Sequence, residues 1–270
     1  MNLKSKTALA ALSLVACTAA FAQDKAPEPD YTWSFNLGAV SDYRFRGLEQ
    51  TAGGPSIQGG IDFAHKSGFY AGTFVASNIK WIKEFNGASQ GSYELDLYGG
   101  FKGEITSGLG FDVGVITYQY PGNNSGSAGT PGGTAYTKAD TTEVYAGVSY
   151  SVASLKYYQS VGDFLGNLNS NGSRYWDLNA TFDLGNGFSL TPHLGWQTVP
   201  NQSSATKTGN AANYSDYALT LAKDMGNGVV ISLAAVGTDA KEGDFYNSTF
   251  YGTNRFYGKS GYVVGLKYNF

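Results

Sequence analysis

The chain has 270 residues, including 37 glycines and 20 tyrosines, and only 14% of its residues carry a formal charge, which is low for a soluble surface. The net charge of −3 is small and spread along the chain, so nothing in the composition indicates a nucleic-acid-binding face. Beyond the first twenty-two residues no apolar run approaches the roughly 18 residues of a transmembrane helix, which excludes a helical membrane protein.

The first segment, residues 1–22, has the pattern of a secretory signal peptide. A positively charged start precedes an apolar stretch over residues 7–16, and an Ala-Phe-Ala sequence ends at Ala22. We expect cleavage after Ala22 and export of the remaining chain. Residues 14–17 also fit a lipoprotein cleavage box, so the alternative is a mature chain that begins at a lipid-modified Cys17.

Residues 23–30 contain two prolines among charges and are predicted to be a short disordered lead-in. The next stretch, residues 31–46, changes to a period of two, which is typical of a β-strand with one apolar and one polar face. The apolar face carries Trp33, Phe35, Leu37, Ala39, Tyr43 and Phe45. The opposite face carries Thr32, Ser34, Asn36, Asp42, Arg44 and Arg46.

The same alternation returns in segments of about ten residues, the usual length of a strand that crosses a membrane. The further predicted strands are residues 55–65, 69–80, 93–102, 109–118, 142–152, 155–161, 174–184, 188–198, 215–224, 229–238 and 261–270. With the first strand they make twelve.

The predicted connections alternate between short and long. Short turns, several with Asn-Gly or Ser-Gly pairs that suit tight hairpins, are expected at residues 66–68, 103–108, 153–154, 185–187 and 226–228. Long polar loops are expected at residues 47–54, 81–92, 119–140, 162–173, 199–214 and 239–260. This alternation predicts an up-and-down order of strands with both termini at the short-turn end.

These patterns together predict an all-β fold: a transmembrane up-and-down antiparallel β-barrel of about 12 strands over residues 31–270. In hydrocarbon a spanning sheet must close, because unsatisfied backbone groups are too costly there, and its outward positions must be apolar. Aromatic residues near the strand ends would form the two interfacial girdles, namely Trp33, Tyr43, Phe45, Tyr93, Trp176, Tyr217, Tyr262 and Tyr268. The alternative is a soluble β-sandwich with its apolar residues turned inward.

The last predicted strand places an apolar residue at every second position up to an aromatic carboxyl terminus. This ending resembles the recognition signal of outer-membrane barrels and predicts the barrel-assembly machinery as a partner. The proposed assembly signal consists of Tyr262, Val264, Leu266, Tyr268 and Phe270.

Four short stretches resemble the TorF porin family of Gram-negative bacteria, also called the Gcw_chp family. They are VSDYRFRG at residues 40–47, PSIQGGID at 55–62, SGFYAGT at 67–73 with Ser77-Asn78, and ELDLYGG at 94–100. Phe74 stands where the family would have tryptophan, and Glu49 where it would have a small hydroxyl residue, which would change the charge of the outer rim. The resemblance implies a location in the bacterial outer membrane and a channel role, without a defined substrate.

The expected function is passive diffusion of small polar solutes or ions through the lumen, with outer-membrane lipid and lipopolysaccharide as surroundings. Opposing charges across a narrow lumen would filter solutes, whereas the alternative is that these charges pair and plug the interior. The predicted pore-lining residues are Asp42, Arg44, Arg46, Glu94, Asp96, Asp112, Glu143, Asp177 and Asp183, and Lys156 and Lys267 are also expected to point into the barrel.

Two other classes of function stay open at this point. A structural or adhesive barrel would bind partners through its long loops. A barrel enzyme would have to use His65 or His193 as a base, yet no Gly-x-Ser-x-Gly elbow is present. No cofactor is expected, because the sequence has no transition-metal set and no phosphate-binding loop, and the acidic residues 239–244 read as a solvated loop more than as a calcium site.

Overall fold

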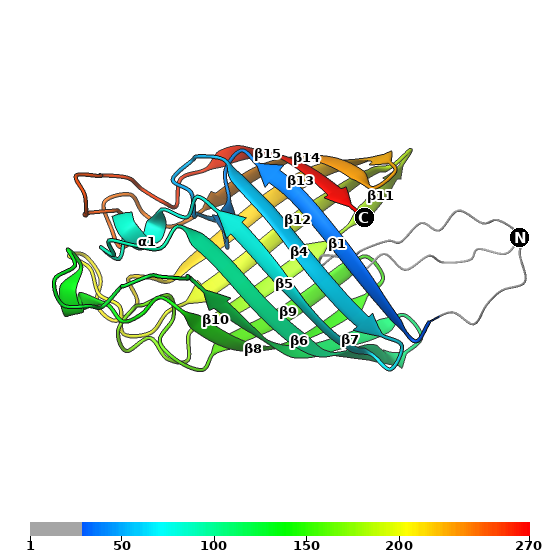
Figure 1. The fold of residues 1–270 in the computed structure, drawn as a ribbon, viewed down its shortest axis with the longest axis horizontal. Coiled ribbons are helices and arrows are strands. Elements are labelled where there is room, and N and C mark those ends of the chain that lie inside the picture. The colour runs from blue at the N-terminus through cyan, green and yellow to red at the C-terminus, as the bar shows by residue number, and fades with distance from the viewer. Residues whose placement is uncertain (1–28) are drawn as a thin grey trace, which may run out of the picture.

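The computed structural model describes residues 29–270. The predicted signal peptide, the alternative lipid attachment at Cys17 and residues 23–28 of the predicted lead-in lie outside this range. The described chain forms a closed antiparallel barrel whose strands are strongly tilted (Figure 1). Within this range no helix has the length and apolar character needed to cross a membrane.

The barrel strands follow one another around the wall in chain order. They are β1 (Tyr31–Val40), β4 (Ser56–His65), β5 (Phe69–Ser77), β6 (Tyr93–Thr106), β7 (Leu109–Gln119), β8 (Thr141–Tyr150), β9 (Ala153–Ser160), β10 (Arg174–Ala180), β11 (Phe182–Gly185), β12 (Phe188–Thr198), β13 (Tyr214–Gly226), β14 (Val229–Thr238) and β15 (Gly261–Asn269). Both β10 and β11 pair with β12, so they form one wall strand that is interrupted at Thr181. The predicted twelve-stranded up-and-down barrel is therefore confirmed.

The barrel closes where β1 pairs with β15, with Asn36 opposite Asn269 and Val40 opposite Gly265. Closure leaves no free sheet edge, which is the condition for placing a sheet in hydrocarbon. The short turns lie at one end, and the long loops lie at the other end together with the short helix α1 (Trp81–Glu84) and the 3₁₀ turn η1 (Gly133–Ala135) (Figure 1).

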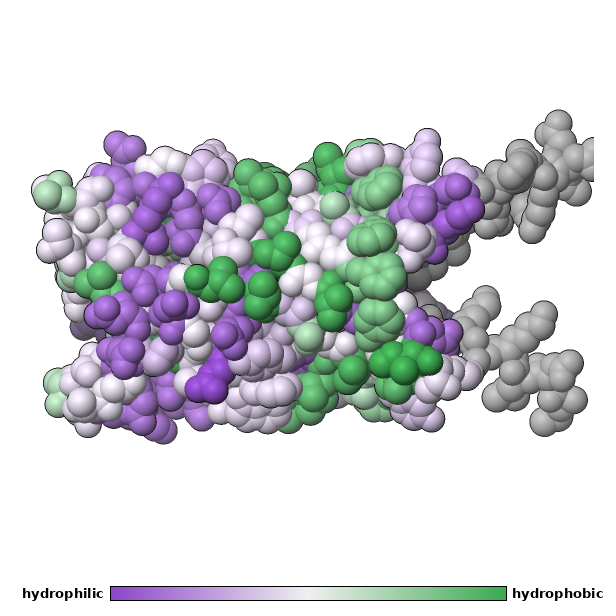
Figure 2. All heavy atoms as spheres, turned by 90° about the horizontal axis from the view of Figure 1, so that it is seen from below, coloured by the Kyte–Doolittle hydropathy of each residue, from purple (hydrophilic) through white to green (hydrophobic). Residues whose placement is uncertain are grey.

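The apolar face of the wall points outward. Large outward side chains remain exposed along most strands, as with Trp33 at 56%, Leu97 at 44% and Leu233 at 49%. Figure 2 shows hydrophobic residues gathered on the barrel wall between hydrophilic residues at both ends. A soluble sandwich would bury these side chains, so the outward apolar surface argues against that alternative.

The structure corrects the first predicted strand. β1 ends at Val40, and the chain then leaves the wall instead of continuing to residue 46. Tyr43 and Phe45 consequently do not belong to the lipid-facing girdle, because both pack inside the barrel. The other predicted girdle residues are outward and exposed: Trp33, Tyr93, Trp176, Tyr217, Tyr262 and Tyr268.

Smaller corrections concern the turns and the end of one strand. The turn predicted at residues 153–154 lies at Ser151 and Val152, where Ser151 has a φ of 54°. β6 continues to Thr106, so the turn predicted over residues 103–108 shortens to Ser107 and Gly108. β5 ends at Ser77 and not at residue 80. The inward or outward direction of the neighbouring side chains is unaffected.

Candidate functional site: the lumen and its inner hairpin

The segment after β1, residues 41–55, folds into the barrel and is called the inner hairpin here. Its two short strands, β2 (Arg44–Phe45) and β3 (Leu48–Glu49), pair antiparallel. Arg46 and Gly47 form the turn between them with φ values of 49° and 79°. Positive φ at both central residues is the geometry of a tight two-residue hairpin turn. A Cβ on Gly47 would lie 2.7 Å from Asp216 Cβ on β13, so the close approach to the wall also requires glycine.

Arg46 at the tip of the inner hairpin reaches the far wall of the barrel. Its guanidinium donates to both carboxylate oxygens of Glu143 on β8, at 2.5 and 3.1 Å, and to Gln197 Oε1 on β12 at 2.8 Å. The Tyr214 hydroxyl donates to the Arg46 carbonyl oxygen at 2.9 Å. Because β8 and β12 are separated from β1 by several strands in either direction around the wall, these contacts carry the hairpin across the lumen.

Aromatic rings surround the same guanidinium. Its central carbon lies 4.2 Å from the ring centroid of Tyr175, 5.3 Å from that of Tyr158 and 5.4 Å from that of Phe164. Cation–π attraction is strongest where the cation is desolvated, and the Arg46 side chain is only 5% exposed. The paired charges and the rings together explain how an arginine is accommodated in so buried a position.

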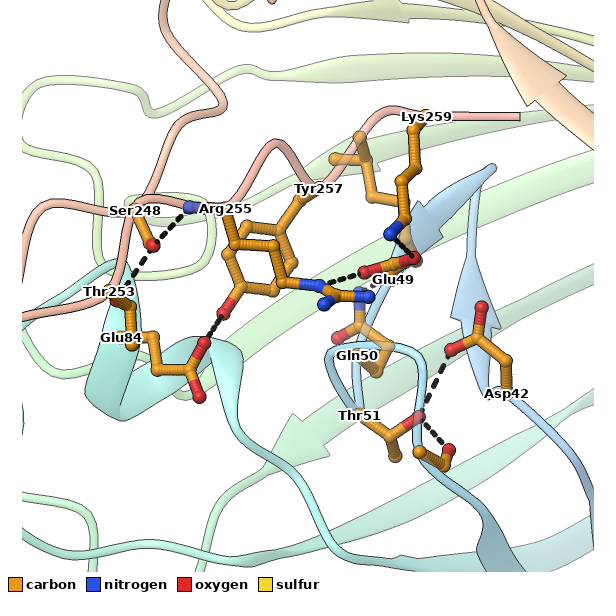
Figure 3. A network of polar contacts seen from close by, with 12 residues as sticks. Asp42, Glu49, Gln50, Thr51, Glu84, Ser248, Thr253, Arg255, Tyr257 and Lys259 are labelled. Carbon is orange, nitrogen blue, oxygen red and sulfur yellow. Dashed lines mark hydrogen bonds and ion pairs between the residues drawn. The ribbon is translucent and has the colours of Figure 1, made fainter. Parts of the chain in front are cut away.

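A second set of charges attaches the inner hairpin to the last long loop, residues 239–260 (Figure 3). Glu49 is 1% exposed and accepts a hydrogen bond from Arg255, and its Oε1 lies 3.7 Å from Lys259 Nζ. This hydrogen bond raises the pKa of Arg255 above its ordinary value. Arg44 completes the set, donating to Asp42 at 2.5 Å and to Glu49 at 3.2 Å.

The long-loop end of the barrel is filled by apolar side chains above the inner hairpin. Trp81 and Ile82 of α1 pack with Tyr118, Tyr120 and other buried residues, and Tyr43 and Phe45 of the hairpin contact this cluster. The Phe45 ring meets the Tyr118 ring edge-on at 5.2 Å. In the described conformation the outer part of the lumen is thus occupied by the hairpin and the loops.

Below the inner hairpin the lumen opens into a cavity of about 370 Å³. Residues 44–47 of the hairpin form its roof, and its polar walls come from β10, β12 and β13, including Asp177, Asn179, His193 and Asp216. His193 Nε2 lies 2.8 Å from Asp216, and Nδ1 lies 3.2 Å from Asp177. Each ring nitrogen is therefore close to a carboxylate of the wall.

Further toward the short-turn end the lumen remains polar and partly exposed. Lys156 Nζ lies 2.6 Å from Asp112, and the Tyr70 hydroxyl donates to the same carboxylate. The Tyr98 hydroxyl donates to Asp62 on β4. These side chains leave a polar wall from the short-turn mouth up to the cavity.

The structure places the predicted pore-lining residues in three groups. Asp42, Arg44 and Arg46 belong to the inner hairpin instead of the wall. The second group lies on inner faces of strands and comprises Glu94, Asp96, Asp112, Glu143 and Asp177, together with Lys156 and Lys267. Asp183 is exposed at the short-turn rim, where it accepts a hydrogen bond from the Gly185 backbone N–H at 2.8 Å.

Among the lumenal residues that were not singled out from the sequence are Asp62, Gln197 and Asp216. Each stands at an inward position of its strand, next to outward residues such as Ile61 and Tyr217. The alternation of apolar and polar residues could therefore have identified them as lumenal. The remaining histidine, His65, ends β4 at the short-turn rim, with Nδ1 2.7 Å from Ser67 Oγ. No metal-binding group of His, Cys, Asp or Glu occurs within residues 29–270.

Solved porin structures have a similar barrel at very low sequence identity. The NanC porin has a TM-score of 0.55 at 10% identity, with 88% of this chain and 99% of that chain covered. The KdgM porin has a TM-score of 0.52 at 8% identity, with the same coverage. KdgM in complex with disordered oligogalacturonate gives 0.51 at 8% identity, again over 88% and 99% of the two chains. These likenesses concern the fold.

A family model described as "Bacterial protein of unknown function (Gcw_chp)" matches residues 24–270. The match covers nearly the whole chain and includes all the stretches that carried the resemblance in the sequence. The TorF name is not part of that description and stays a prediction. No curated protein sequence matches the chain significantly.

Proposed function

The chain belongs to the Gcw_chp family of bacterial proteins of unknown function, and we propose that it is an outer-membrane channel for passive diffusion of small polar solutes. In this proposal the short turns face the periplasm and the long loops face outward, as in other outer-membrane barrels. The inner hairpin keeps the outer half of the lumen closed until it moves.

The observation that carries the proposal is the contrast between the two faces of the wall. The outer face is apolar, while the inner face is polar and partly exposed from the short-turn mouth to the 370 Å³ cavity. A barrel that served only as a scaffold could fill its interior with packed apolar side chains. The fold it shares with the NanC and KdgM porins supports the same function.

The contacts of the inner hairpin favour the role of a movable gate over that of a permanent plug. It is a single short segment that is held by Arg46 with Glu143 and Gln197, by Glu49 with Arg255, and by packing of Tyr43 and Phe45 against the apolar cluster. Val40 pairs directly with Ser56 on the neighbouring strand, so the wall does not need the hairpin in order to close. Movement of the hairpin, together with the loop side chains that pack above it, would open a path along the polar wall.

Solute uptake by vesicles tests the proposal. The chain from residue 23 onward would be refolded into liposomes, and swelling would be followed with neutral sugars of increasing size. A variant in which a short glycine-rich turn replaces residues 42–54 should admit small sugars much faster than the wild type. A matched control would remove residues 203–209, which lie mostly exposed in another long loop, and should behave like the wild type.

Correctly inserted barrels that admit no solute in either form would contradict the channel and favour a structural or adhesive barrel. Insertion would be verified by protection of the strands from protease.

A further inference from the structure

The wall of the lumen directs more carboxylates than cations inward. The lysines on the inner faces of the strands are Lys102, Lys156 and Lys267, since Lys223 lies beside the outward ring of Phe188. Only Lys156 among the three forms an ion pair in the part of the chain that the structure describes. Lys102 and Lys267 therefore add positive charge, and the net charge of the lumen depends on how far the inward carboxylates outnumber these lysines.

Around the cavity the negative charges are only partly balanced. His193 is shared between Asp177 and Asp216, so one cation at most faces two carboxylates. Further toward the short-turn end, Asp62 accepts from the neutral Tyr98 hydroxyl, and its Oδ2 is buried without a hydrogen-bond partner in the part of the chain that the structure describes. Lys267 is close enough to attract Asp62 but forms no ion pair with it. Asp112, also toward the short-turn end, is paired with Lys156.

The short-turn mouth adds further carboxylates. Glu104, Asp183 and Asp224 each accept a hydrogen bond from a backbone N–H of the adjacent turn, at 2.7 to 2.8 Å. All three are exposed, and each stands next to a register shift one residue pair before the end of the strand pairing. These hydrogen bonds to the turns explain the positions of the three carboxylates. Their negative charges nevertheless lie at the short-turn entrance of the lumen.

Near the inner hairpin two carboxylates on β6 have no compensating cation. Glu94 is fully buried and Asp96 is 6% exposed. Glu94 Oε2 and Asp96 Oδ1 have no hydrogen-bond partner, and neither residue forms an ion pair within residues 29–270. Burial without a partner favours the protonated, neutral form of a carboxyl group, so Glu94 and Asp96 would contribute negative charge only after movement of the inner hairpin admits water to them.

The inner hairpin does not offset the excess of carboxylates on the lumen wall. Arg44 is paired with Asp42 and Glu49, and Arg46 is paired with Glu143. The segment from residue 42 to residue 54 contains two arginines, one aspartate and one glutamate, so it contributes no net formal charge. Movement of the hairpin would consequently leave an acidic lumen.

From this distribution we infer that the lumen selects cations, such as inorganic cations and small protonated amines, and disfavours anions. A narrow path with one sign of charge and low-dielectric walls raises the local concentration of the opposite ion. The inference rests on the proposed function and names the solute class that the same lumen would pass. Asp62 is the wall residue expected to contribute most directly, because it forms no ion pair within residues 29–270 and accepts a hydrogen bond there from a neutral hydroxyl.

Reversal potentials in planar bilayers under a KCl gradient test this inference. The wild type and the variant with residues 42–54 replaced would both be measured, since that replacement is charge-neutral. We expect potassium permeability to exceed chloride permeability several-fold. Asp62→Lys should lower that ratio clearly, and Asp62→Asn should lower it less. Glu242→Lys, in an exposed part of the last long loop, is the control and should leave the ratio unchanged.

The two proposals fail in different ways. The cation inference would be wrong, and the channel proposal unaffected, if the barrel conducted but preferred chloride. The same holds if Asp62→Lys left the permeability ratio unchanged while Glu242→Lys altered it. Silence of both the wild type and the hairpin replacement would overturn the channel itself and the inference with it.

Discussion

At the scale of single residues, the Arg46 guanidinium joins the inner hairpin to two walls of the barrel. Truncating one member of a buried ion pair typically costs about 3–5 kcal/mol, because the other charge is left uncompensated. We expect Arg46→Ala to release the hairpin tip, so that channels open more often and the barrel unfolds at lower denaturant concentration. Arg46→Lys should give an intermediate result, because a lysine cannot bind Glu143 with two parallel hydrogen bonds.

A double variant controls for nonspecific damage. If the ion pair holds the hairpin, Glu143→Gln in the Arg46→Ala background should change open probability much less than Glu143→Gln alone. Additive effects of the two substitutions would show that Arg46 acts by another route.

The sequence alone could not reveal this contact. Alternation continues through Tyr43 and Phe45, because these residues of the inner hairpin also face an apolar cluster, and the pattern therefore looked like a longer strand. An arginine with positive φ is uncommon, and here it is stabilised by partners far away in the chain, Glu143 and Gln197. The local pattern contains no information about contacts across a lumen.

At the scale of elements, Glu49 connects the inner hairpin to the last long loop. Arg255→Gln removes a direct partner of this buried carboxylate. We expect the loop of residues 239–260 to open more readily, so that trypsin cleaves after the exposed Lys241 faster than in the wild type. The fragment would be identified by mass. Arg174→Gln, an exposed position outside the network, should not change that rate.

Strands were the most predictable elements, because period-two alternation is a direct consequence of one face in lipid and one in the lumen. The turn between β8 and β9, which was predicted two residues too late in the chain, shows what period-two alternation does not determine. Val152 lies in the turn between β8 and β9, although a β-branched residue favours strands. The turn conformation depends there on the positive φ of Ser151, which composition did not indicate.

At the scale of the whole molecule, the orientation of the two faces gives a stability prediction. Leu219 on β13 is outward and 48% exposed, and Thr220 next to it points inward. Arginine on the lipid face costs about 2–4 kcal/mol near the bilayer midplane. Leu219→Arg should therefore lower the free energy of unfolding in lipid vesicles by an amount in this range, and Thr220→Arg by much less. Equal losses would mean that the assignment of faces is wrong.

Closure, strand order and the outward apolar surface followed from the sequence because each is a requirement repeated in every strand. The inner hairpin occurs once, and its position depends on the width of the closed barrel. No repeated sequence pattern could therefore predict it. The predicted lumenal charges were largely placed on inner faces, whereas their pairing, such as Asp112 with Lys156, emerged only from the three-dimensional arrangement.

Single-channel conductance is the most direct test of the central claim, that the barrel is a channel closed by its inner hairpin. Wild-type protein and the variant lacking residues 42–54 would be compared in planar bilayers at equal salt. We predict rare, brief openings of the wild type and long-lived, discrete openings of the variant. Indistinguishable traces from the two proteins would contradict the gate, and an inserted but silent variant would contradict the channel.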